Sequence, residues 1–366
     1  MKVIHIADSA IGMTGGMSRI VWHWRSAFER RGHDFRHFGT QEVGNVPHTR
    51  HFPKAALRFY SKQHEKGDIL LVHEPTAGSF VRRGLKTIVV SHGLERRSWE
   101  IHNHGSSPDL PKPTLKSRLI FPLWRLRGCD LGLRHATGAL LSNQDDKTFA
   151  LARYGIKEAN ILVFKNGANL TPSLQSASLE NTKNILFVGT WLARKGIHTL
   201  ARAGRILHDR GVELHWVLAG TAASSEQVFQ IWPECLHART EVIPKFSEQE
   251  ESGLHQRCNL FVLPSFFEGQ PLALAQAMAY GRCCITTDNC GQKDIIQHRA
   301  NGLLFEPGDA CALAQLIEEC SGNLPFQVEL GTNARRSVQD KSWNIVADEV
   351  VDFVEQIYAK GNTAAA

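Results

Sequence analysis

The segment NLFVLPSFFEGQPLALAQAMAYG, from Asn259 to Gly281, decides the fold, because it predicts a buried strand, a tight turn and a helix in succession. Its apolar run ends at Pro264, as a central strand of a parallel sheet does. Pro271 suits the first position of the following helix, since its φ is fixed and it has no N–H. The free N–H groups of that helix would favour an anion at the carboxyl edge of the sheet.

Two polar side chains flank this anion site: Glu268 in the turn and Gln276 inside the helix. A glutamate before a helix often only complements the helix dipole, and a helical glutamine usually faces solvent. The segment therefore indicates a ligand site only if other parts of the chain supply partners for it.

The composition is typical of a soluble globular protein of two domains, with 366 residues, 42% hydrophobic and 21% charged. The net charge of +6 fits an anionic ligand or membrane surface, and we expect no nucleic acid as a partner. The 8 cysteines form no CxxC pair, which predicts reduced thiols and a cytoplasmic protein. None of the 18 histidines falls in a two-His-plus-acid pattern, so we expect no metal and no cofactor. The sequence predicts neither a secretory signal nor a membrane span.

Strand and helix signals alternate along the chain and predict an α/β protein with two doubly wound halves. We expect a first domain at 1–167, a linker at 168–182, a second domain at 183–342 and, at 343–366, a helix that packs back on the first domain, followed by a disordered tail. In the first half the patterns predict strands at Lys2–Ala7, Asp34–Phe38, Asp68–His73, Lys86–Ser91, Thr137–Leu141 and Ile161–Phe164. In the second half they predict strands at Asn184–Val188, Glu213–Ala219, Thr240–Ile243, Asn259–Pro264, Cys283–Thr286 and Leu303–Phe305.

The loop after the first strand carries Gly15 and Gly16, which permit close approach of a ligand to the backbone. The spacing is not the dinucleotide pattern GxGxxG, so a nicotinamide site is disfavoured. Ser18 is expected to cap the helix that follows. His92 lies at the end of another predicted strand, where it either lines the ligand edge or only bonds to the backbone.

Residues 115–127 predict a basic amphipathic helix, which sets Phe121, Leu123 and Trp124 against Lys116, Arg118, Arg125 and Arg127. Such a helix can contact an anionic membrane surface. The alternative is a helix packed on the sheet with its basic face in solvent.

The loop from Gly189 to Gly196 follows the first strand of the second half and carries Arg194 and Lys195. A solvated pair of cations in a surface loop is the alternative. Because this loop and the Glu268 turn lie at the carboxyl edge of one parallel sheet, a single diphosphate could be held by Lys195 and by the N-terminus of the Pro271 helix. The same charges would stabilise a departing diphosphate.

Together these motifs resemble the retaining glycosyltransferases of family 4, which have the GT-B fold of two Rossmann-like domains facing each other across a cleft. The resemblance spans nearly the whole chain. It is carried most specifically by Phe267-Glu268-Gly269-Gln270-Pro271 followed by Ala277-Met278-Ala279-Tyr280-Gly281. Further matches are Gly15-Gly16, Ser91-His92-Gly93-Leu94-Glu95, Gly189 to Gly196 and Leu218-Ala219-Gly220.

The resemblance implies metal-independent transfer of a sugar from a UDP- or GDP-sugar with retention of the anomeric configuration. It implies that Lys195 binds the donor diphosphate, that Glu268 contacts hydroxyls of the transferred sugar and that His92 lies near the reacting sugar. The remaining donor contacts fall, by the same resemblance, on Gly15, Gly16, Thr190, Arg194, Gly220, Gly269, Gln270, Pro271, Leu272 and Gln276.

Two positions depart from the family pattern. Thr190 stands where the family has an arginine, so Arg194 is the candidate for the missing phosphate cation. Gln276 stands where the family has a second glutamate that holds the ribose. Its amide loses the charge-assisted part of that hydrogen bond, about 1 kcal/mol.

We therefore expect a glycosyltransferase that builds a surface or lipid-linked glycan at the cytoplasmic side of a membrane. Its partners would be a nucleotide-sugar donor, a glycan or lipid-linked acceptor, and an anionic membrane contacted through residues 115–127. Two alternatives stay open: a nucleotide-sugar 2-epimerase on the same architecture, and a catalytically silent GT-B binding subunit.

Overall fold

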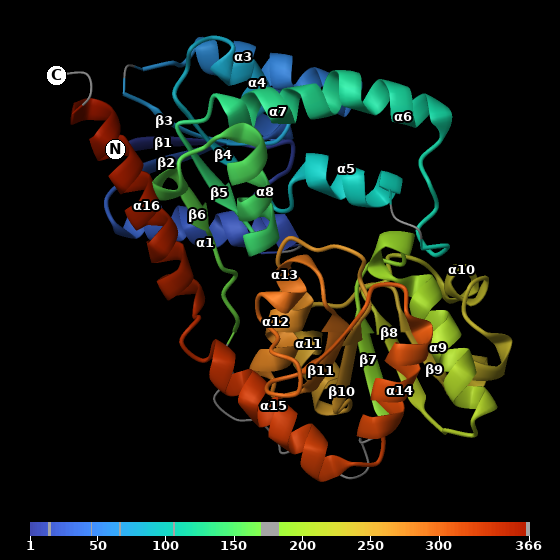
Figure 1. Cartoon of the computed structure of the whole chain (residues 1–366). Coiled ribbons are helices and arrows are strands. Elements are labelled where there is room, and N and C mark those ends of the chain that lie inside the picture. The colour runs from blue at the N-terminus through green and yellow to red at the C-terminus, as the bar shows by residue number, and fades with distance from the viewer. Residues whose placement is uncertain (14–15, 45, 66, 105–106, 170–182, 364–366) are drawn as a thin grey trace. The chain divides into compact units, whose positions relative to one another are not determined.

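The computed structural model describes residues 1–363 apart from 14–15, 45, 66, 105–106 and 170–182. The candidate Gly15, most of the expected linker and the end of the expected tail lie outside the described residues. The chain forms two units (Figure 1). Unit 1 consists of Met1–His104, Lys112–Gly167 and Trp343–Ala366, and unit 2 consists of Gly105–Pro111 and Ala168–Ser342.

Unit 1 is built on a parallel six-stranded sheet in the order β2-β1-β3-β4-β5-β6. Its strands are β1 (Lys2–Ile6), β2 (Asp34–Phe38), β3 (Ile69–His73), β4 (Thr87–Val90), β5 (Gly138–Leu141) and β6 (Ile161–Val163). Strand β1 pairs with β2 on one side and with β3 on the other, so the strand order reverses between β1 and β3. All five residues of β3 are buried, which is why its sequence is a nearly continuous apolar run.

Helices cover both faces of this sheet, and Figure 1 shows α3, α4, α6 and α7 gathered on one side of it. The helices of unit 1 are α1 (Gly16–Arg30), α2 (Thr40–Val43), α3 (Phe52–Ser61), α4 (Ala77–Val81), α5 (Glu95–His104), α6 (Leu115–Phe121), α7 (Arg127–Arg134), α8 (Gln144–Tyr154) and α16 (Trp343–Thr363), with the short turns η1 (Thr49–His51), η2 (Pro122–Leu126) and η3 (Glu158–Asn160). The prediction that Ser18 caps α1 is wrong, because the helix already begins at Gly16. The Ser18 hydroxyl instead donates to the Ala10 carbonyl at 2.8 Å.

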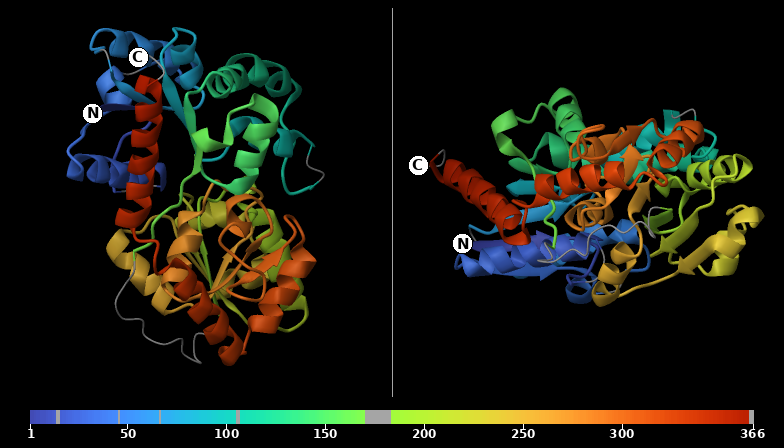
Figure 2. Two further views of the ribbon diagram at one scale, coloured as in Figure 1. Left: turned by 60° about the vertical axis from the view of Figure 1, so that its left-hand side comes forward. Right: turned by 90° about the horizontal axis from the view of Figure 1, so that it is seen from below.

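The C-terminal helix α16 packs on unit 1, as the sequence predicts, and it lies against α1 (Figures 1 and 2). Val350 and Val354 on its inner side are fully buried. On its outer side, Glu355 Oε2 lies 2.6 Å from Arg31 Nη2. Because that ion pair is exposed, apolar burial provides most of the stabilisation.

The helix predicted at 115–127 is interrupted by a π-helical turn, η2, which begins at Pro122 between α6 and α7. Two of its residues face inward: Phe121, as in the alternative of a packed helix, and Arg125, which both alternatives set on the basic face. Phe121 stacks on Trp99 of α5 with ring centroids 4.7 Å apart. Arg125 Nη2 lies 2.6 Å from Glu95 Oε1, so this arginine is not part of a free basic face.

Unit 2 has a second parallel six-stranded sheet, in the order β12-β11-β10-β7-β8-β9. Its strands are β7 (Asn184–Val188), β8 (His215–Ala219), β9 (Thr240–Ile243), β10 (Leu260–Leu263), β11 (Cys283–Thr287) and β12 (Leu303–Phe305). Its helices and turns are η5 (Ala193–Lys195), α9 (Ile197–Asp209), α10 (Ser225–Phe229), η6 (Glu234–Arg239), α11 (Glu248–Gln256), α12 (Leu272–Ala279), α13 (Cys290–Lys293), α14 (Ala310–Cys320) and α15 (Leu324–Val338). The strand order reverses between β7 and β10, which are direct neighbours. The side chains of β10 are all buried, and each contributes about 2 kcal/mol.

Residues 107–111 belong to unit 2, although the sequence places them inside the first domain. Asp109 fixes this segment: its Oδ2 accepts a hydrogen bond from the Thr199 hydroxyl at 2.6 Å, and its other oxygen pairs with Arg202. Local sequence patterns could not reveal this placement, because the partners lie 90 and 93 residues further along the chain.

Within the described ranges, no helix combines the length and the apolar composition that a membrane span requires.

Candidate active site

The loops that follow β7 and β10 meet where the strand order of unit 2 reverses. In open parallel sheets, ligands bind beyond the carboxyl ends of the strands at such a point. A backbone hydrogen bond joins the two loops, because the Phe266 N–H donates to the Arg194 carbonyl at 2.9 Å. The two loops therefore hold their side chains at one location.

Lys195 and Glu268, which the sequence places at one ligand edge, form an ion pair through Nζ and Oε1. Arg194 Nη1 lies 3.9 Å from the same carboxylate oxygen. The Lys195 and Glu268 side chains are only 15% and 12% exposed, whereas Arg194 is 42% exposed. Two cations thus face one carboxylate, and the excess positive charge favours an incoming phosphate that competes with Glu268 for Lys195.

Gly196 brings the Lys195 turn into direct contact with the end of β10. Its φ is +73°, and a Cβ atom there would lie 1.9 Å from the Pro264 carbonyl oxygen. Both the left-handed backbone and the close approach require glycine. The close contact of Gly196 with Pro264 holds the neighbouring Lys195 in place, with its side chain directed toward Glu268.

A second close approach supports the Glu268 loop from α13. A Cβ atom on Gly291 would lie 1.9 Å from the Gly269 carbonyl oxygen, and the Gly291 N–H donates to the Glu268 carbonyl at 3.3 Å. The Asn289 amide donates to the Phe266 carbonyl at 2.6 Å. Sequence reasoning missed Asn289, because its partner belongs to a neighbouring strand's loop.

Helix α12 begins at Leu272, and Pro271 is its N-cap, with φ −75° and ψ 109°. The Pro271 carbonyl accepts the first helical hydrogen bond, from Ala275 N–H at 3.1 Å. The prediction that Pro271 occupies the first helical position is therefore wrong by one residue, because Pro271 is the N-cap and its ψ is still extended. Gly269 and Gln270 form the turn ahead of this helix end, as expected.

Gln276 lies inside α12 as predicted, but it is only 5% exposed. Its Oε1 accepts from the Asn169 N–H at 3.3 Å, and its Nε2 donates to the Asn169 carbonyl at 3.4 Å. A carboxylate could not make the second bond, because it has no donor. The Gln276 amide therefore bonds both backbone groups of Asn169, the second residue of the segment Ala168–Ser342.

Thr190 and Gly220 lie in the loops after β7 and β8 at the same sheet edge. Gly220 has φ +67°, and its N–H donates to the Ile243 carbonyl at 2.8 Å. The Trp191 N–H donates to the Thr221 carbonyl at 2.8 Å, which ties these two loops together. Both candidate residues are half-buried, so they border the ligand edge.

The candidates Gly16 and His92 belong to unit 1. Gly16 is the first residue of α1, and His92 lies two residues beyond β4. The His92 ring stacks on Trp24 at 6.2 Å, and its Nε2 makes no hydrogen bond to any described residue. Burial lowers the pKa of His92 to about 4, so its imidazole is neutral at physiological pH.

His92 ends a row of histidines that the sequence did not reveal. Nitrogen atoms of His37 and His5 lie 2.9 Å apart, those of His5 and His73 also lie 2.9 Å apart, and the ring of His73 lies 5.1 Å from that of His92. Burial lowers the pKa of His5 and His73 well below the usual value, with the neighbouring histidines as a further cause. In the described part of the chain, no group of three or more His, Cys, Asp or Glu side chains is arranged to hold a metal ion.

The Ser9 carbonyl at one end of this row determines which histidine nitrogens donate and which accept. His37 Nε2 lies 2.8 Å from the Ser9 carbonyl, which can only accept, so this nitrogen carries the proton. A neutral His37 must then accept at Nδ1 from His5, and His5 must accept at Nε2 from His73. The row is therefore a chain of neutral imidazoles with one allowed set of tautomers.

Glu74, next to His73, is a further polar group that sequence analysis missed. Its Oε2 accepts from the Glu95 N–H at 3.4 Å, and its Oε1 has no partner among the residues described. Burial and then the Glu95 carboxylate raise the pKa of Glu74 to about 8. This shift favours the protonated carboxyl group, which can donate a hydrogen bond. The only sequence signal for it was its place at the end of a predicted strand.

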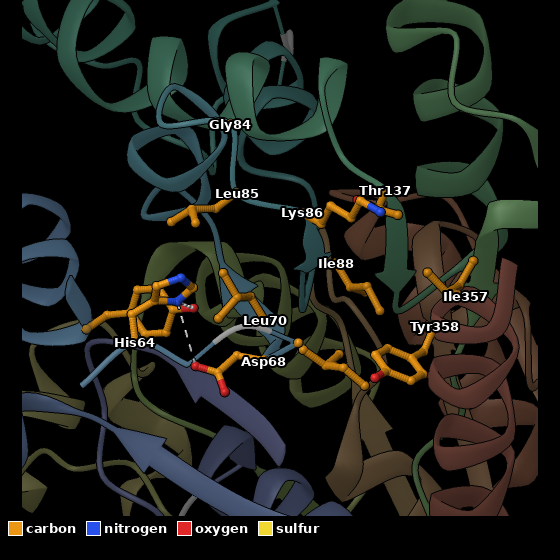
Figure 3. Close-up of a pocket in the computed structure, with 13 residues that line it drawn as sticks. His64, Asp68, Leu70, Gly84, Leu85, Lys86, Ile88, Thr137, Ile357 and Tyr358 are labelled. Carbon is orange, nitrogen blue, oxygen red and sulfur yellow. Dashed lines mark hydrogen bonds and ion pairs between the residues drawn. The ribbon is translucent and has the colours of Figure 1, made fainter. Parts of the chain in front are cut away.

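A pocket of about 370 Å³ lies at the opposite, amino edge of the unit 1 sheet (Figure 3). It is lined by the first residues of β3 and β4 and by Tyr358 of α16. Near its mouth His64 Nδ1 lies 3.9 Å from Asp68 Oδ2. None of the described candidate residues lines this pocket, and parallel sheets bind their ligands at the other edge.

Solved structures identify the architecture. Sucrose-phosphate synthase from Thermosynechococcus elongatus is similar over 98% of this chain and 99% of its own, with a TM-score of 0.77 and 19% identity. HepE from Anabaena, solved in complex with UDP-glucose, is similar over 97% of this chain and 100% of its own, with a TM-score of 0.67 and 15% identity. Two Rossmann-like units of this kind define the GT-B fold of glycosyltransferases, as the sequence predicts.

Sequence relatives are glycosyltransferases as well. An uncharacterized glycosyltransferase from Haemophilus influenzae is 26% identical over 371 residues, which cover 95% of this chain and 99% of the relative. The N,N'-diacetylbacillosaminyl-diphospho-undecaprenol alpha-1,3-N-acetylgalactosaminyltransferase of Campylobacter jejuni is 23% identical over 247 residues, 62% of each chain. Residues 173–337, within unit 2, match the model of the family Glycosyl transferases group 1. With the relatives named above, this match identifies the protein as a glycosyltransferase.

Proposed function

We propose that the protein is a metal-independent retaining glycosyltransferase that moves a sugar from a nucleotide-sugar to a hydroxyl group of a glycan or lipid-linked acceptor. One observation carries the proposal: Lys195, Arg194 and Glu268 converge at the strand-order reversal of unit 2. This is the place where an open parallel sheet binds a ligand, and it holds more positive than negative charge.

The donor diphosphate binds Lys195 and Arg194 in this proposal, with the N-terminus of α12 completing the anion site. These cations take over from a metal ion the task of neutralising the leaving diphosphate. When phosphate engages Lys195, the Glu268 carboxylate is released to accept hydrogen bonds from hydroxyls of the transferred sugar. The similarity to HepE, solved with UDP-glucose, supports a UDP-sugar as donor.

The reaction breaks the bond between the anomeric carbon and the diphosphate oxygen and forms a bond from that carbon to the acceptor oxygen on the same face. The acceptor proton passes to the departing phosphate oxygen. Lys195 stabilises the charge that develops on that phosphate, and it does so without reorganisation because Gly196 and Glu268 already hold it in place. In the same proposal His92, the candidate of unit 1, packs near the sugar as a neutral positioning group.

A lipid-linked acceptor is supported by the Campylobacter jejuni relative, whose name describes a diphospho-undecaprenol substrate. Relatives in amylovoran and colanic acid biosynthesis support a role in surface polysaccharide synthesis. We infer peripheral contact with an anionic membrane through residues 115–127, on the cytoplasmic face where nucleotide-sugars are made. The 2-epimerase and the silent subunit gain no support from these relatives, each of which is named as a glycosyltransferase.

The experiment is a thermal-shift screen of the full chain against UDP-, GDP- and other nucleotide-sugars, because a ligand bound only by the native state raises the melting temperature. We expect one donor class to raise it and Lys195→Ala to remove the shift. Transfer to an acceptor extract should then proceed at the same rate with EDTA and give a product with the donor's anomeric configuration. A shift that survives Lys195→Ala would contradict the proposed site, and isotope exchange at the second sugar carbon without acceptor would identify an epimerase.

A further inference from the structure

The outer face of α6 and η2 carries a stripe of leucines that nothing in the described chain covers. Leu115, Leu119 and Leu123 are 77%, 72% and 72% exposed. Spaced four residues apart, they lie on one side of the helix, about one turn from one another. Soluble proteins rarely align large apolar side chains in solvent, so this stripe indicates a contact surface.

The inner face of the same helix is fixed to unit 1. Phe121 stacks on Trp99, and Arg125 pairs with Glu95. The stripe therefore cannot turn inward without breaking these contacts. Its exposure is a property of the folded unit.

A cationic pocket adjoins the end of this stripe. It has a volume of about 270 Å³, and Leu123 and Trp124 form part of its wall. Its other lining residues include four cations from η1, α3, the end of α4 and the start of α7: Arg50, Lys54, Arg82 and Arg127. The lining contains no Asp or Glu.

These four cations form no ion pair with any residue that the structure describes. Most surface arginines of the chain do have a carboxylate partner, such as Arg257 with Glu241 at 2.7 Å. Four like charges around one small pocket repel each other unless an anion enters. The arrangement therefore selects a compact, multiply charged anion such as a phosphate group.

We propose that this pocket binds the phosphate of an anionic lipid headgroup while the leucine stripe enters the headgroup region of the same membrane. Leu123 belongs to both features, so the apolar and the cationic contacts meet one surface at the same time. Stable attachment to a membrane takes two such signals, since either one alone binds weakly and reversibly. The helices that carry the stripe and most of the pocket lining, α3, α4, α6 and α7, lie on a single side of unit 1 (Figure 1).

This inference deepens the proposed function and rests on it in one respect, that the acceptor is lipid-linked. A headgroup held in the pocket would keep unit 1 at the surface where such an acceptor is embedded. The two ideas have separate readouts, because vesicle binding requires no donor and donor binding requires no vesicle.

The experiment is cosedimentation of the full chain with vesicles of phosphatidylcholine alone and of phosphatidylcholine mixed with phosphatidylglycerol. We expect binding to the mixed vesicles and much weaker binding to phosphatidylcholine alone. Arg82→Glu should weaken binding to the mixed vesicles on the order of tenfold, because it reverses one pocket charge. Leu119→Asp should weaken it by a similar factor while leaving every pocket charge in place.

The matched control is Lys157→Glu, the same charge change at an exposed position outside the pocket, beside β6. It should bind vesicles like the unaltered chain. If Lys157→Glu and Arg82→Glu lost vesicle binding equally, net charge alone would explain the effect. The proposed phosphate site in the pocket would then be wrong. Circular dichroism and melting temperature establish that each variant is folded.

Three further outcomes would overturn the inference: binding that is the same on both kinds of vesicle, saturation of the pocket by inorganic phosphate without any vesicle binding, or a dimer in solution that Leu123→Asp converts to a monomer. The last would assign the stripe to a second copy of the chain. Lys195→Ala should bind vesicles normally. If no nucleotide-sugar binds while vesicle binding follows the pattern above, the donor assignment fails and the lipid site stands.

Discussion

The two units reverse their strand order in the same way, but opposite chemistry occupies the two reversal points. In unit 2 the point between β7 and β10 holds Lys195, Arg194 and Glu268, all charged. In unit 1 the point between β1 and β3 holds His5 and His73, whose pKa values burial lowers strongly. The same sheet geometry therefore presents a cluster of charged side chains in one unit and a neutral environment in the other.

The difference arises from where the side chains are attached. Lys195 and Glu268 come from loops beyond the strand ends, where each charge finds a partner and some solvent. His5 lies within β1 and His73 is the last residue of β3, so both are desolvated by the core. Desolvation favours the neutral form of both histidines, and the hydrogen bonds along the row are compatible with neutral imidazoles. In the proposed reaction the first environment suits the leaving diphosphate, whereas the second suits an uncharged group.

The largest effect is expected for Lys195→Ala, which removes the charge that distinguishes unit 2. We expect kcat/KM to fall by about 10²–10³, because one preorganised charge on the leaving group is lost. Initial rates with the donor found by thermal shift provide the measurement. Lys183→Ala, at the amino edge before β7, is the control and should keep full activity. Comparable rates for Lys195→Ala and the unaltered chain would contradict the role of Lys195 at the leaving diphosphate.

Gly196→Ala tests whether unit 2 depends on the close approach beneath Lys195. A Cβ atom would meet the Pro264 carbonyl at 1.9 Å, so we expect the free energy of unfolding to fall by about 3 kcal/mol or more. Gly211→Ala is the matched control, because Gly211 has φ +75° with nothing within 4 Å of its Cβ position, and it should cost about 1 kcal/mol. Urea denaturation measures both. If both variants lost the same free energy of unfolding, the backbone near Pro264 would be able to move away from the added Cβ atom at little cost.

The neutral histidines of unit 1 predict that its stability falls with acid. Their folded pKa values are lowered, to about 4 for His92, while in the unfolded chain they return to about 6.5. The contribution of the histidines to stability is therefore complete above pH 6.5 and is lost as the pH falls from there, at about 1.4 kcal/mol per pH unit for each histidine that stays neutral. Glu74, with its pKa raised to about 8, acts in the opposite direction and offsets one of them.

Hydrogen exchange resolves this effect by unit, after correction for the intrinsic exchange rate. We expect protection of β1 and β3 to fall more steeply between about pH 7 and pH 5 than protection of β7 and β10. In unit 2, burial lowers the pKa of His255 to about 3, so some slope is expected there as well. Identical slopes in the two sheets would show that the histidine row is not the origin.

The smallest effect is expected for Gln276→Glu, which restores the residue that the family pattern has. The substitution removes the hydrogen bond that the Gln276 amide donates to the Asn169 carbonyl and should lower the free energy of unfolding by about 1–2 kcal/mol. The new carboxylate should also tighten donor binding by about 1 kcal/mol if it reaches the ribose. Calorimetric titration with the donor measures this gain. Gln276→Met, similar in size but without polar atoms, is the control and should lose stability without gaining affinity.

The fold could be predicted because buried parallel strands are continuous apolar runs. The strands of both sheets coincide within two residues at each end with the predicted segments. The convergence of Lys195 and Glu268 could also be predicted, because loops that follow neighbouring strands at one edge of a sheet lie close together. In both cases the information is local or follows from topology alone.

The histidine row could not be predicted, because its members lie 32 and 68 residues apart and each is an ordinary strand residue. Their meeting depends on the register of β1 with its two neighbours. The same holds for Gln276, whose partner is the backbone of Asn169, and for Asp109, whose partners lie on α9. Lys195 and Glu268 are also far apart in the sequence, but the shared edge of one sheet predicts their contact. Contacts that depend on strand register or on the path of a connecting segment carry no such signal in a single sequence.

Helix α16 has a consequence for how the chain acquires its structure. It packs against α1 near the start of the chain, so unit 1 combines the first and the last segments synthesised. All of unit 2 emerges from the ribosome in between, and it can complete its own sheet while unit 1 still lacks α16. Until α16 is synthesised, the side of α1 that it covers has no such partner, so unit 1 can complete its packing only after the last segment of the chain has been made.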